Sequence, residues 1–152
     1  NFVNQDFVEK YKSELKKLQG RKRKKIKSMD LGEIISQVSS NIKQNHKFIE
    51  VILFFHPQQQ VISKIRERFS SAFKDKRIFV FIGSDWNHHS YQAAFGDKDT
   101  FFVLLISCRY LVEMPALDKE ILKKNVDTLK LIGEATYRTI EDKSILYSLS
   151  EV

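Results

Sequence analysis

Two short apolar segments with an amphipathic stretch between them constrain the fold of this chain more than any other feature. Lys47 to Phe55 and Ile78 to Ile82 are rich in aromatic and β-branched side chains, as buried strands require. Between them, apolar side chains recur at helical spacing from Val61 to Phe73, after Pro57, which suits the first turn of a helix. This order predicts a βαβ unit with parallel strands and a right-handed connection.

Further strands are expected after this unit, and they make the predicted sheet a mixed one. Phe101 to Ile106 is a continuous apolar run, and Arg109 to Met114 alternates enough to form a strand. Only Ser107 and Cys108 separate the two, so we expect a hairpin. The alternation from Ile145 to Leu149 predicts a short terminal strand. We therefore expect an α/β (α+β) domain with a mixed sheet, a βαβ unit, a hairpin and packing helices.

Ile52 and Phe79, each in the middle of an apolar run of the βαβ unit, are expected in the same buried sheet.

Two helices are indicated outside the βαβ unit. Val3 to Leu18 has an apolar stripe at helical spacing and is followed by Gly20, a common stop signal. Asp118 is a good N-cap for a long helix whose inner side ends near Tyr137. Gly83 to Gly96, in contrast, is polar and is expected to be irregular.

The segment from Leu31 to Ile42 fits two structures. Its apolar residues have helical spacing, and Asp30 and Glu33 have the spacing of a capping box. Gly32 near the start and the serine and β-branched residues from Gln37 to Lys43 suit an edge strand better. The local pattern leaves both open.

Length, composition and cysteine use indicate one folded domain in a reducing, intracellular compartment. A chain of 152 residues can bury one core, and 42% hydrophobic residues are too many for a disordered chain. The longest apolar run, Phe101 to Ile106, is far shorter than the roughly 20 residues of a membrane-spanning helix. The single cysteine, Cys108, cannot form an internal disulfide.

Positive charge is concentrated near the start of the chain. Residues 1–30 contain ten basic and four acidic side chains, which accounts for six of the seven net positive charges. Six of the seven residues from Arg21 to Lys27 are basic. We call this run the basic tract. An uneven distribution of this kind indicates a polyanionic partner, although a solvated face is the alternative.

Catalytic and metal-binding patterns are weak. His56, Asp85, His88 and His89 could form a metal or acid–base cluster, but their spacing is not that of a zinc site. Gly83-Ser84-Asp85 lacks the second glycine and the lysine of a phosphate-binding loop. Trp86 could stack on an unpaired base or pack onto the body. We expect neither a metal nor a catalytic site.

The segments Glu50 to Gln58, Val61 to Phe73 and Arg77 to Ile82 follow one another as an apolar strand ending in a Pro, a charged helix closing on a Phe, and a second strand that begins with a basic residue. In this order they resemble the family of ribosomal protein seven of the eukaryotic small subunit. The C-terminal third is similar too, at Leu117-Asp118-Lys119, Val126-Asp127-Thr128, Tyr137-Arg138 and Ser150-Glu151, and the whole similarity covers roughly residues 34–152. The resemblance implies a β-hairpin from Val38 to Phe55 that turns at Gln44 to His46. The chain departs from the family in two places: it has only Gly83 to Asp99 where the family has a long basic loop and a helix, and its Arg21 to Lys27 tract is stronger than the family implies.

The resemblance implies a structural constituent of the small ribosomal subunit that binds rRNA and catalyses nothing. The charge distribution, in turn, predicts that residues 1–30 are an N-terminal helix with an rRNA-binding tract and residues 31–152 the globular domain. Partners would be small-subunit rRNA and neighbouring ribosomal proteins in cytoplasmic ribosomes after nucleolar assembly, with no membrane, cofactor or small-molecule substrate. The candidate RNA-binding residues are Lys16, Lys17, Arg21, Lys22, Arg23, Lys24, Lys25 and Lys27, with a second group of Lys74, Lys76, Arg77, His88, His89 and Arg109. The alternatives are a nucleic-acid-processing enzyme and a basic protein-interaction module.

Overall fold

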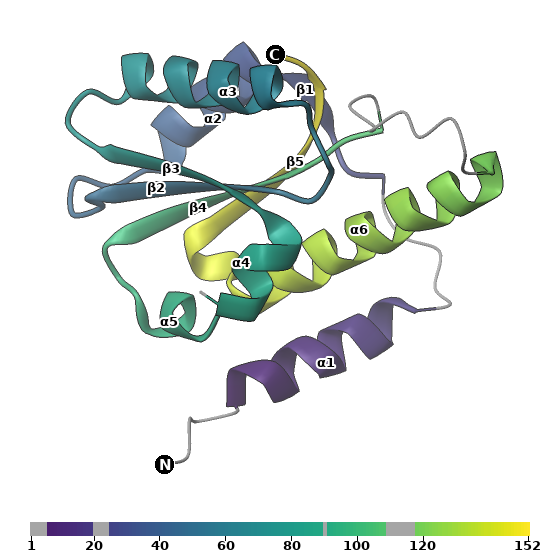
Figure 1. The fold of residues 1–152 in the computed structure, drawn as a ribbon. Coiled ribbons are helices and arrows are strands. Elements are labelled where there is room, and N and C mark those ends of the chain that lie inside the picture. Colours follow the sequence, from purple (N-terminus) through teal and green to yellow (C-terminus); the bar gives the residue numbers. More distant parts are fainter. Residues whose placement is uncertain (1–5, 20–24, 90, 109–117) are drawn as a thin grey trace.

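A parallel β-sheet with helices on both faces forms the body of the protein (Figure 1). The computed structural model describes residues 6–19, 25–89, 91–108 and 118–152. Within these residues the sheet has five strands in the order β1-β5-β4-β2-β3, and every neighbouring pair is parallel. The predicted α/β domain is therefore confirmed, with a parallel sheet in place of the mixed one.

The elements alternate along the chain as a parallel sheet requires. The strands are β1 (Ser28–Asp30), β2 (Phe48–Leu53), β3 (Arg77–Ile82), β4 (Thr100–Ile106) and β5 (Ser144–Glu151). The helices are α1 (Asp6–Leu18), α2 (Leu31–Asn41), α3 (Gln59–Ala72), α4 (Gly83–His89), α5 (Tyr91–Gly96) and α6 (Lys119–Thr139), and a short 3-10 turn spans Glu141–Lys143.

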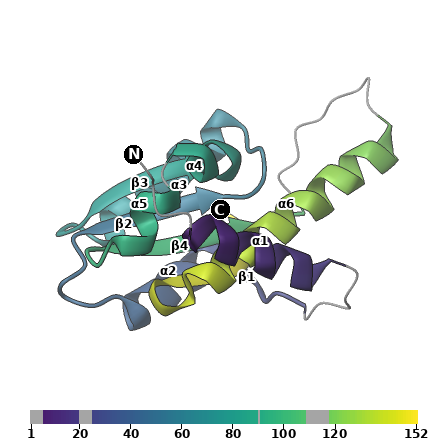
Figure 2. The ribbon, with the colours of Figure 1, turned by 90° about the horizontal axis from the view of Figure 1, so that it is seen from below.

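The sheet separates two hydrophobic clusters. On one face, α2 and α3 bury side chains such as Ile34 and Phe69 against β2 and β4. On the other face, α4, α5 and α6 cover Ile52, Phe102 and Leu104. Helix α1 packs alongside α6 on the outside of this second layer, as both ribbon views show (Figure 2). Helix α1 therefore belongs to the folded body.

The predicted βαβ unit is β2-α3-β3, and its strands pair in register from Phe48 with Arg77 to Leu53 with Ile82. Helix α3 begins at Gln59, so Pro57 precedes the helix instead of lying in its first turn. The prediction that Ile52 and Phe79 are buried together is only half right. Ile52 is fully buried, but β3 is an edge strand and Phe79 is 41% exposed.

The hairpin that the resemblance implies from Val38 to Phe55 is wrong, because residues 31–41 are helical. Helix α2 has the full capping box: the Asp30 carboxylate accepts the Glu33 N–H over 2.9 Å, and Glu33 accepts the Asp30 N–H over 2.9 Å. Two satisfied backbone donors stabilise the helix start. The spacing of Asp30 and Glu33 was therefore the better guide to this segment.

The second predicted hairpin is not formed at β4. Both sides of this strand are occupied, by β2 and by β5, and both pairings are parallel. The predicted partner, Arg109 to Met114, lies outside the described residues. Strand β4 is buried along its whole length, as its apolar sequence indicates.

The polar stretch from Gly83 to Gly96 was expected to be irregular, but it forms α4 and α5. Trp86 of α4 is 1% exposed and its ring meets Phe102 edge-on, with 5.8 Å between centroids. One large buried side chain thus attaches a polar segment to the core. The alternative in which Trp86 packs onto the body is confirmed.

The C-terminal elements agree with the sequence pattern. Asp118 caps α6 by accepting the Glu120 N–H over 3.1 Å, and the terminal strand β5 lies between β4 and β1. Strand β1 pairs only with the last part of β5, from Ser148 onward.

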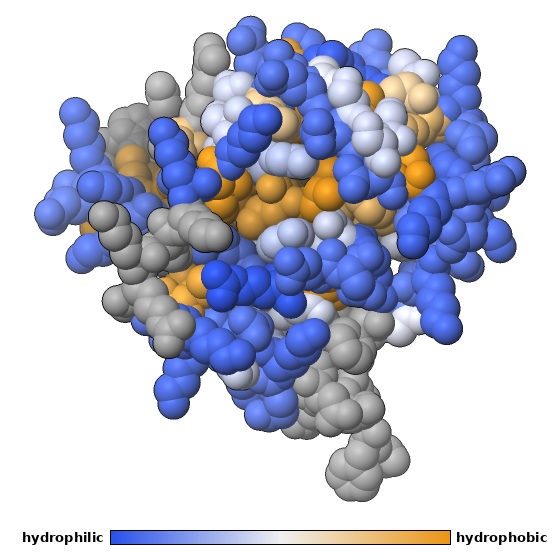
Figure 3. Space-filling model, turned by 180° about the vertical axis from the view of Figure 1, so that it is seen from behind, coloured by the Kyte–Doolittle hydropathy of each residue, from blue (hydrophilic) through white to orange (hydrophobic). Residues whose placement is uncertain are grey.

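From behind, apolar side chains form a band at the level of the sheet, with hydrophilic side chains above and below (Figure 3).

Candidate nucleic-acid interface

The basic tract lies between two buried anchors. Before it, Leu18 at the end of α1 is 3% exposed; after it, Met29 of β1 is 4% exposed. The N–H of Ser148 in β5 donates a hydrogen bond to the Lys27 carbonyl over 3.0 Å. Arg21, Lys22, Arg23 and Lys24 lie outside the described residues. The tract is therefore joined to the folded body at both ends.

A hollow of about 580 Å³ lies where the tract reaches the sheet. Strands β4 and β5 contribute Ile106, Cys108 and Leu149, all near the carboxyl ends of the strands, and Lys25 comes from the tract. Helix α6 contributes Lys130 from the side. The hollow therefore brings two residues of the tract, Lys25 and Ile26, beside three elements that are distant in the sequence.

The charges inside this hollow nearly balance. Lys25 lines it together with Asp127, Lys130 and Glu134 of α6, while Ile106 and Leu149 add apolar surface. A volume of this size fits a small polar ligand or a short stretch of a chain. Among the described residues, Lys27 lies between the lining residues Ile26 and Ser28 and adds an exposed positive charge.

The sheet has a switch point between β2 and β4, where successive connections run toward opposite edges of the sheet, and a side chain fills this point. The chain leaves β2 toward β3 and leaves β4 toward β5, so the carboxyl ends of β2 and β4 flank the crevice in which such folds bind ligands. Here Phe54 fills it with 1% exposure. A Cβ at Gly83 would lie 2.5 Å from the Phe54 ring, and one at Gly133 would lie 3.2 Å from it. The two glycines therefore permit close packing around this ring.

The second group of predicted RNA-binding residues lies elsewhere. Lys74, Lys76 and Arg77 are at the amino end of β3, and a six-residue strand is about 20 Å long. The tract meets β5 at the carboxyl ends of the strands. Lys76 is mostly covered and its Nζ lies 3.1 Å from Asp75 Oδ2. The fold places this second group and the tract at opposite edges of the sheet.

Two other predicted lysines are on the last turn of α1. Lys17 donates to Glu14 Oε1 over 3.0 Å, and its side chain is half exposed. Lys16 is exposed on the same turn. Both therefore lie directly before the tract and can extend its positive surface. Arg109 lies outside the described residues.

The histidine and aspartate residues do not form a site that the structure can describe. His56 follows β2 and Asp85 lies in α4, and both side chains are exposed. His88 and His89 end α4, and their side chains are outside the described part. Within that part, no group of three or more His, Cys, Asp or Glu side chains is placed to hold a metal ion.

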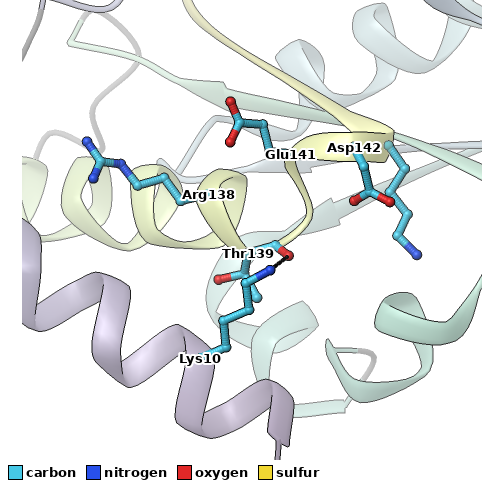
Figure 4. A pocket seen from close by; sticks show the side chains of 6 residues that line it. Lys10, Arg138, Thr139, Glu141 and Asp142 are labelled. Atoms are coloured by element: carbon cyan, nitrogen blue, oxygen red, sulfur yellow. Dashed lines mark hydrogen bonds between the residues drawn. The ribbon is translucent and has the colours of Figure 1, made fainter.

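A second hollow, of about 530 Å³, lies between α1 and the end of α6 (Figure 4). Lys10 reaches across it and its Nζ donates to the Thr139 carbonyl over 3.3 Å. Arg138 lies 3.8 Å from Glu14 Oε2 of α1. Glu141 and Asp142 give the lining mixed charge. These contacts attach α1 to α6 and so position the start of the basic tract.

Sequence reasoning missed two features of the site. Glu50 of β2 accepts a hydrogen bond from Trp86 Nε1 over 2.9 Å, and burial raises the pKa of its carboxyl, against the effect of that hydrogen bond. Phe48 and Phe79 form an exposed aromatic corner beside Arg77. Alternation of Arg77 and Phe79 on one face of the strand was the available signal for that corner.

Comparison with known proteins gives no further guide. No family model, curated protein or solved structure matches this chain. The resemblance to the small-subunit ribosomal family remains a prediction. Across the residues that the structure places, no helix is both long and apolar enough to cross a membrane.

Proposed function

We propose that this protein binds RNA through phosphate-directed basic side chains and acts as a non-catalytic component of a ribonucleoprotein. The observation that carries the proposal is the anchoring of the basic tract. Leu18 and Met29 are buried on either side of it, and Lys27 is hydrogen-bonded to β5. The described end of the tract, Lys25 to Lys27, is therefore held beside β5 at the carboxyl ends of the strands.

This arrangement suits recognition of the RNA backbone. Lysine and arginine side chains neutralise phosphates and release counterions, which provides affinity without reading sequence. A folded body then sets the position of those contacts on an RNA of a given shape. The six basic residues from Arg21 to Lys27 supply the charge, and Lys16 and Lys17 extend it.

The closed crevice favours binding over catalysis. In doubly wound proteins the crevice between the diverging strands receives the ligand. Here Phe54 occupies that position between β2 and β4. A nucleic-acid-processing enzyme with this fold would need its reacting groups elsewhere. The protein-interaction alternative is separated from RNA binding by its response to salt.

Binding of purified protein to labelled RNA at several salt concentrations tests the proposal. We expect the logarithm of the affinity to fall steeply and linearly with the logarithm of salt concentration, as counterion release requires. Both single-stranded and duplex RNA should bind, because phosphates are common to both. No binding to either RNA, or an affinity that salt does not change, would contradict the proposal.

The thiol of Cys108 provides an independent probe of the same interface. It is the only cysteine of the chain, it is exposed, and it lines the hollow that contains Lys25. We expect RNA to slow alkylation of this thiol, because RNA on the tract would cover the rim of the hollow. An unchanged alkylation rate at saturating RNA would move the interface away from this edge of the sheet.

The ribosomal form of the proposal is more specific and has its own test. We propose that the RNA is small-subunit rRNA and that other ribosomal proteins pack against the body, in cytoplasmic ribosomes. The all-parallel sheet departs from the hairpin that the family resemblance implies, so this form rests on charge placement and on the collinear segments. Co-sedimentation with 40S-type particles in a gradient of cell extract would support it. Binding to RNA in vitro without co-sedimentation would retain the RNA-binding function and remove the ribosomal one.

A further inference from the structure

An aromatic corner lies at the edge of the sheet opposite the basic tract. Phe79 of β3 is 41% exposed. Its ring centroid is 6.1 Å from that of Phe81, with ring planes within 11° of parallel, and 6.2 Å from that of Phe48 in β2. One exposed phenylalanine is ordinary on a protein surface. Here the exposed Phe79 ring is supported on both sides by the partly buried rings of Phe48 and Phe81, and together they form a platform.

The fold explains why this platform is open. Phe81 packs against the cluster that contains Trp86 of α4, so α4 covers the carboxyl half of this face of β3. Phe79 lies two residues earlier, at the margin of that cover. Strand β3 pairs with β2 on one side, and no described strand pairs with its other side. The amino half of this face is therefore accessible.

Basic side chains border the platform, and the one carboxylate in register with Phe79, Glu50, is half-buried and accepts the Trp86 N–H. Arg77 is exposed and pairs in register with Phe48. Its backbone N–H donates to the Lys47 carbonyl over 3.0 Å. Lys74 is exposed in the turn before β3. Within the described residues no acidic side chain forms an ion pair with Arg77 or Lys74, whereas Lys47 lies 4.0 Å from Asp99 and Lys76 lies beside Asp75. The local charge therefore favours an anionic partner.

We propose that this corner binds unpaired bases of a single-stranded RNA segment, with Phe79 as the stacking residue and Arg77 and Lys74 at its phosphates. Aromatic side chains beside a basic surface are the usual means of binding single strands, because every base has a face that can stack. The inference rests on the proposed RNA-binding function. The inference specifies that the RNA segment lying across β3 is single-stranded.

The test compares Phe79→Leu, Phe79→Tyr and the natural protein on labelled oligouridine and on duplex RNA of equal length. Leucine keeps an apolar side chain but removes the ring, and we expect about a 5- to 100-fold loss of affinity for the single strand. Phe79→Tyr should bind like the natural protein. Duplex binding and the salt slope should stay unchanged in both variants, since no phosphate contact is removed.

Ile121→Ala is the matched control, because Ile121 is also a large exposed apolar residue, at 47% exposure, and lies on α6 away from β3. Far-ultraviolet circular dichroism and urea unfolding verify that each variant folds. Equal single-strand affinity of Phe79→Leu and the natural protein would overturn the proposal and leave the corner as a surface for a protein partner. Equal losses on single-stranded and duplex RNA would also overturn it. If the natural protein binds no RNA at all, the proposed function itself fails, which is a distinct result.

Discussion

Trp86 Nε1 donates a hydrogen bond to Glu50 Oε2 over 2.9 Å, which joins the first helix after β3 to the middle of β2. The indole is 1% exposed, so its N–H needs a partner inside the protein. Glu50 provides that partner, although burial raises the pKa of its carboxyl. The pair thus secures α4 and places an ionisable group in an unfavourable environment.

The first prediction concerns the charge of Glu50. A carboxyl whose pKa is higher in the folded state contributes stability below its unfolded pKa of about 4.5, and that contribution is lost as the pH rises through the folded value. Glu50→Gln keeps an oxygen that can accept from Trp86 but removes the charge. We expect this variant to be more stable than the natural protein at pH 7, with the difference shrinking toward pH 4. Urea unfolding at pH 7 and pH 4 measures this difference in stability. Glu67→Gln, at an exposed position, is the control. A Glu50→Gln variant that is less stable than the natural protein at pH 7 would refute the prediction.

The second prediction concerns His46, which lies before β2 and is 7% exposed. Its Nδ1 accepts the Lys43 N–H over 2.9 Å, so that nitrogen must be unprotonated. Burial lowers the pKa of His46, and Lys43 and Lys76 lower it further. A lowered histidine pKa means that stability is lost as the pH falls through the unfolded value of about 6.5 toward the folded one.

Unfolding free energies measured from pH 7.5 down to pH 5 should show this loss. His46→Asn, whose side-chain oxygen can accept the same N–H, should lose less stability over that range. The exposed His56→Asn serves as control and should follow the natural protein. Identical pH profiles for His46→Asn and the natural protein would show that His46 is not the titrating group.

The third prediction concerns the packing around Phe54. A Cβ at Gly83 would lie 2.5 Å from the ring, whereas one at Gly96 would have no neighbour within 4 Å. We expect Gly83→Ala to lower the unfolding free energy by about 1 to 3 kcal/mol through overpacking. Gly96→Ala should change it by less than about 0.5 kcal/mol. Equal effects of the two substitutions in thermal or urea unfolding would contradict the close packing; a smaller cost of Gly83→Ala in a Phe54→Leu background would support it.

Sequence patterns identified most elements because their signals are local. The capping box of Asp30 and Glu33, the cap at Asp118 and the apolar run of β4 are each contained in a few residues. Order in the sheet is not local: Phe79 is exposed because β3 is an edge strand, and β4 makes no hairpin because β2 and β5 already flank it. The polar sequence around Trp86 concealed α4 and α5, since among the described residues only one buried side chain of each, Trp86 and Ala94, joins the core cluster.

The candidate interface was predictable only in part, for the same reason. The charge of the basic tract is evident from the sequence. Its position is not, because it depends on the pairing of β1 with β5, which joins residues more than a hundred positions apart. Arg77 was selected for its charge, but its place beside Phe48 and Phe79 follows from the pairing of β2 with β3. Tertiary pairing therefore divides the predicted residues into two surfaces.

The salt dependence of RNA binding by a tract variant tests the central claim most directly. Replacing Lys22, Arg23, Lys24 and Lys25 with Gln removes four charges and leaves the buried anchors Leu18 and Met29 in place. Each lost phosphate contact removes roughly 0.7 to 0.9 from the slope of log affinity against log salt, so we predict a weaker-binding, folded protein with a slope smaller by about 3 to 4. A folded variant with the slope and affinity of the natural protein would contradict the claim that the basic tract binds RNA phosphates.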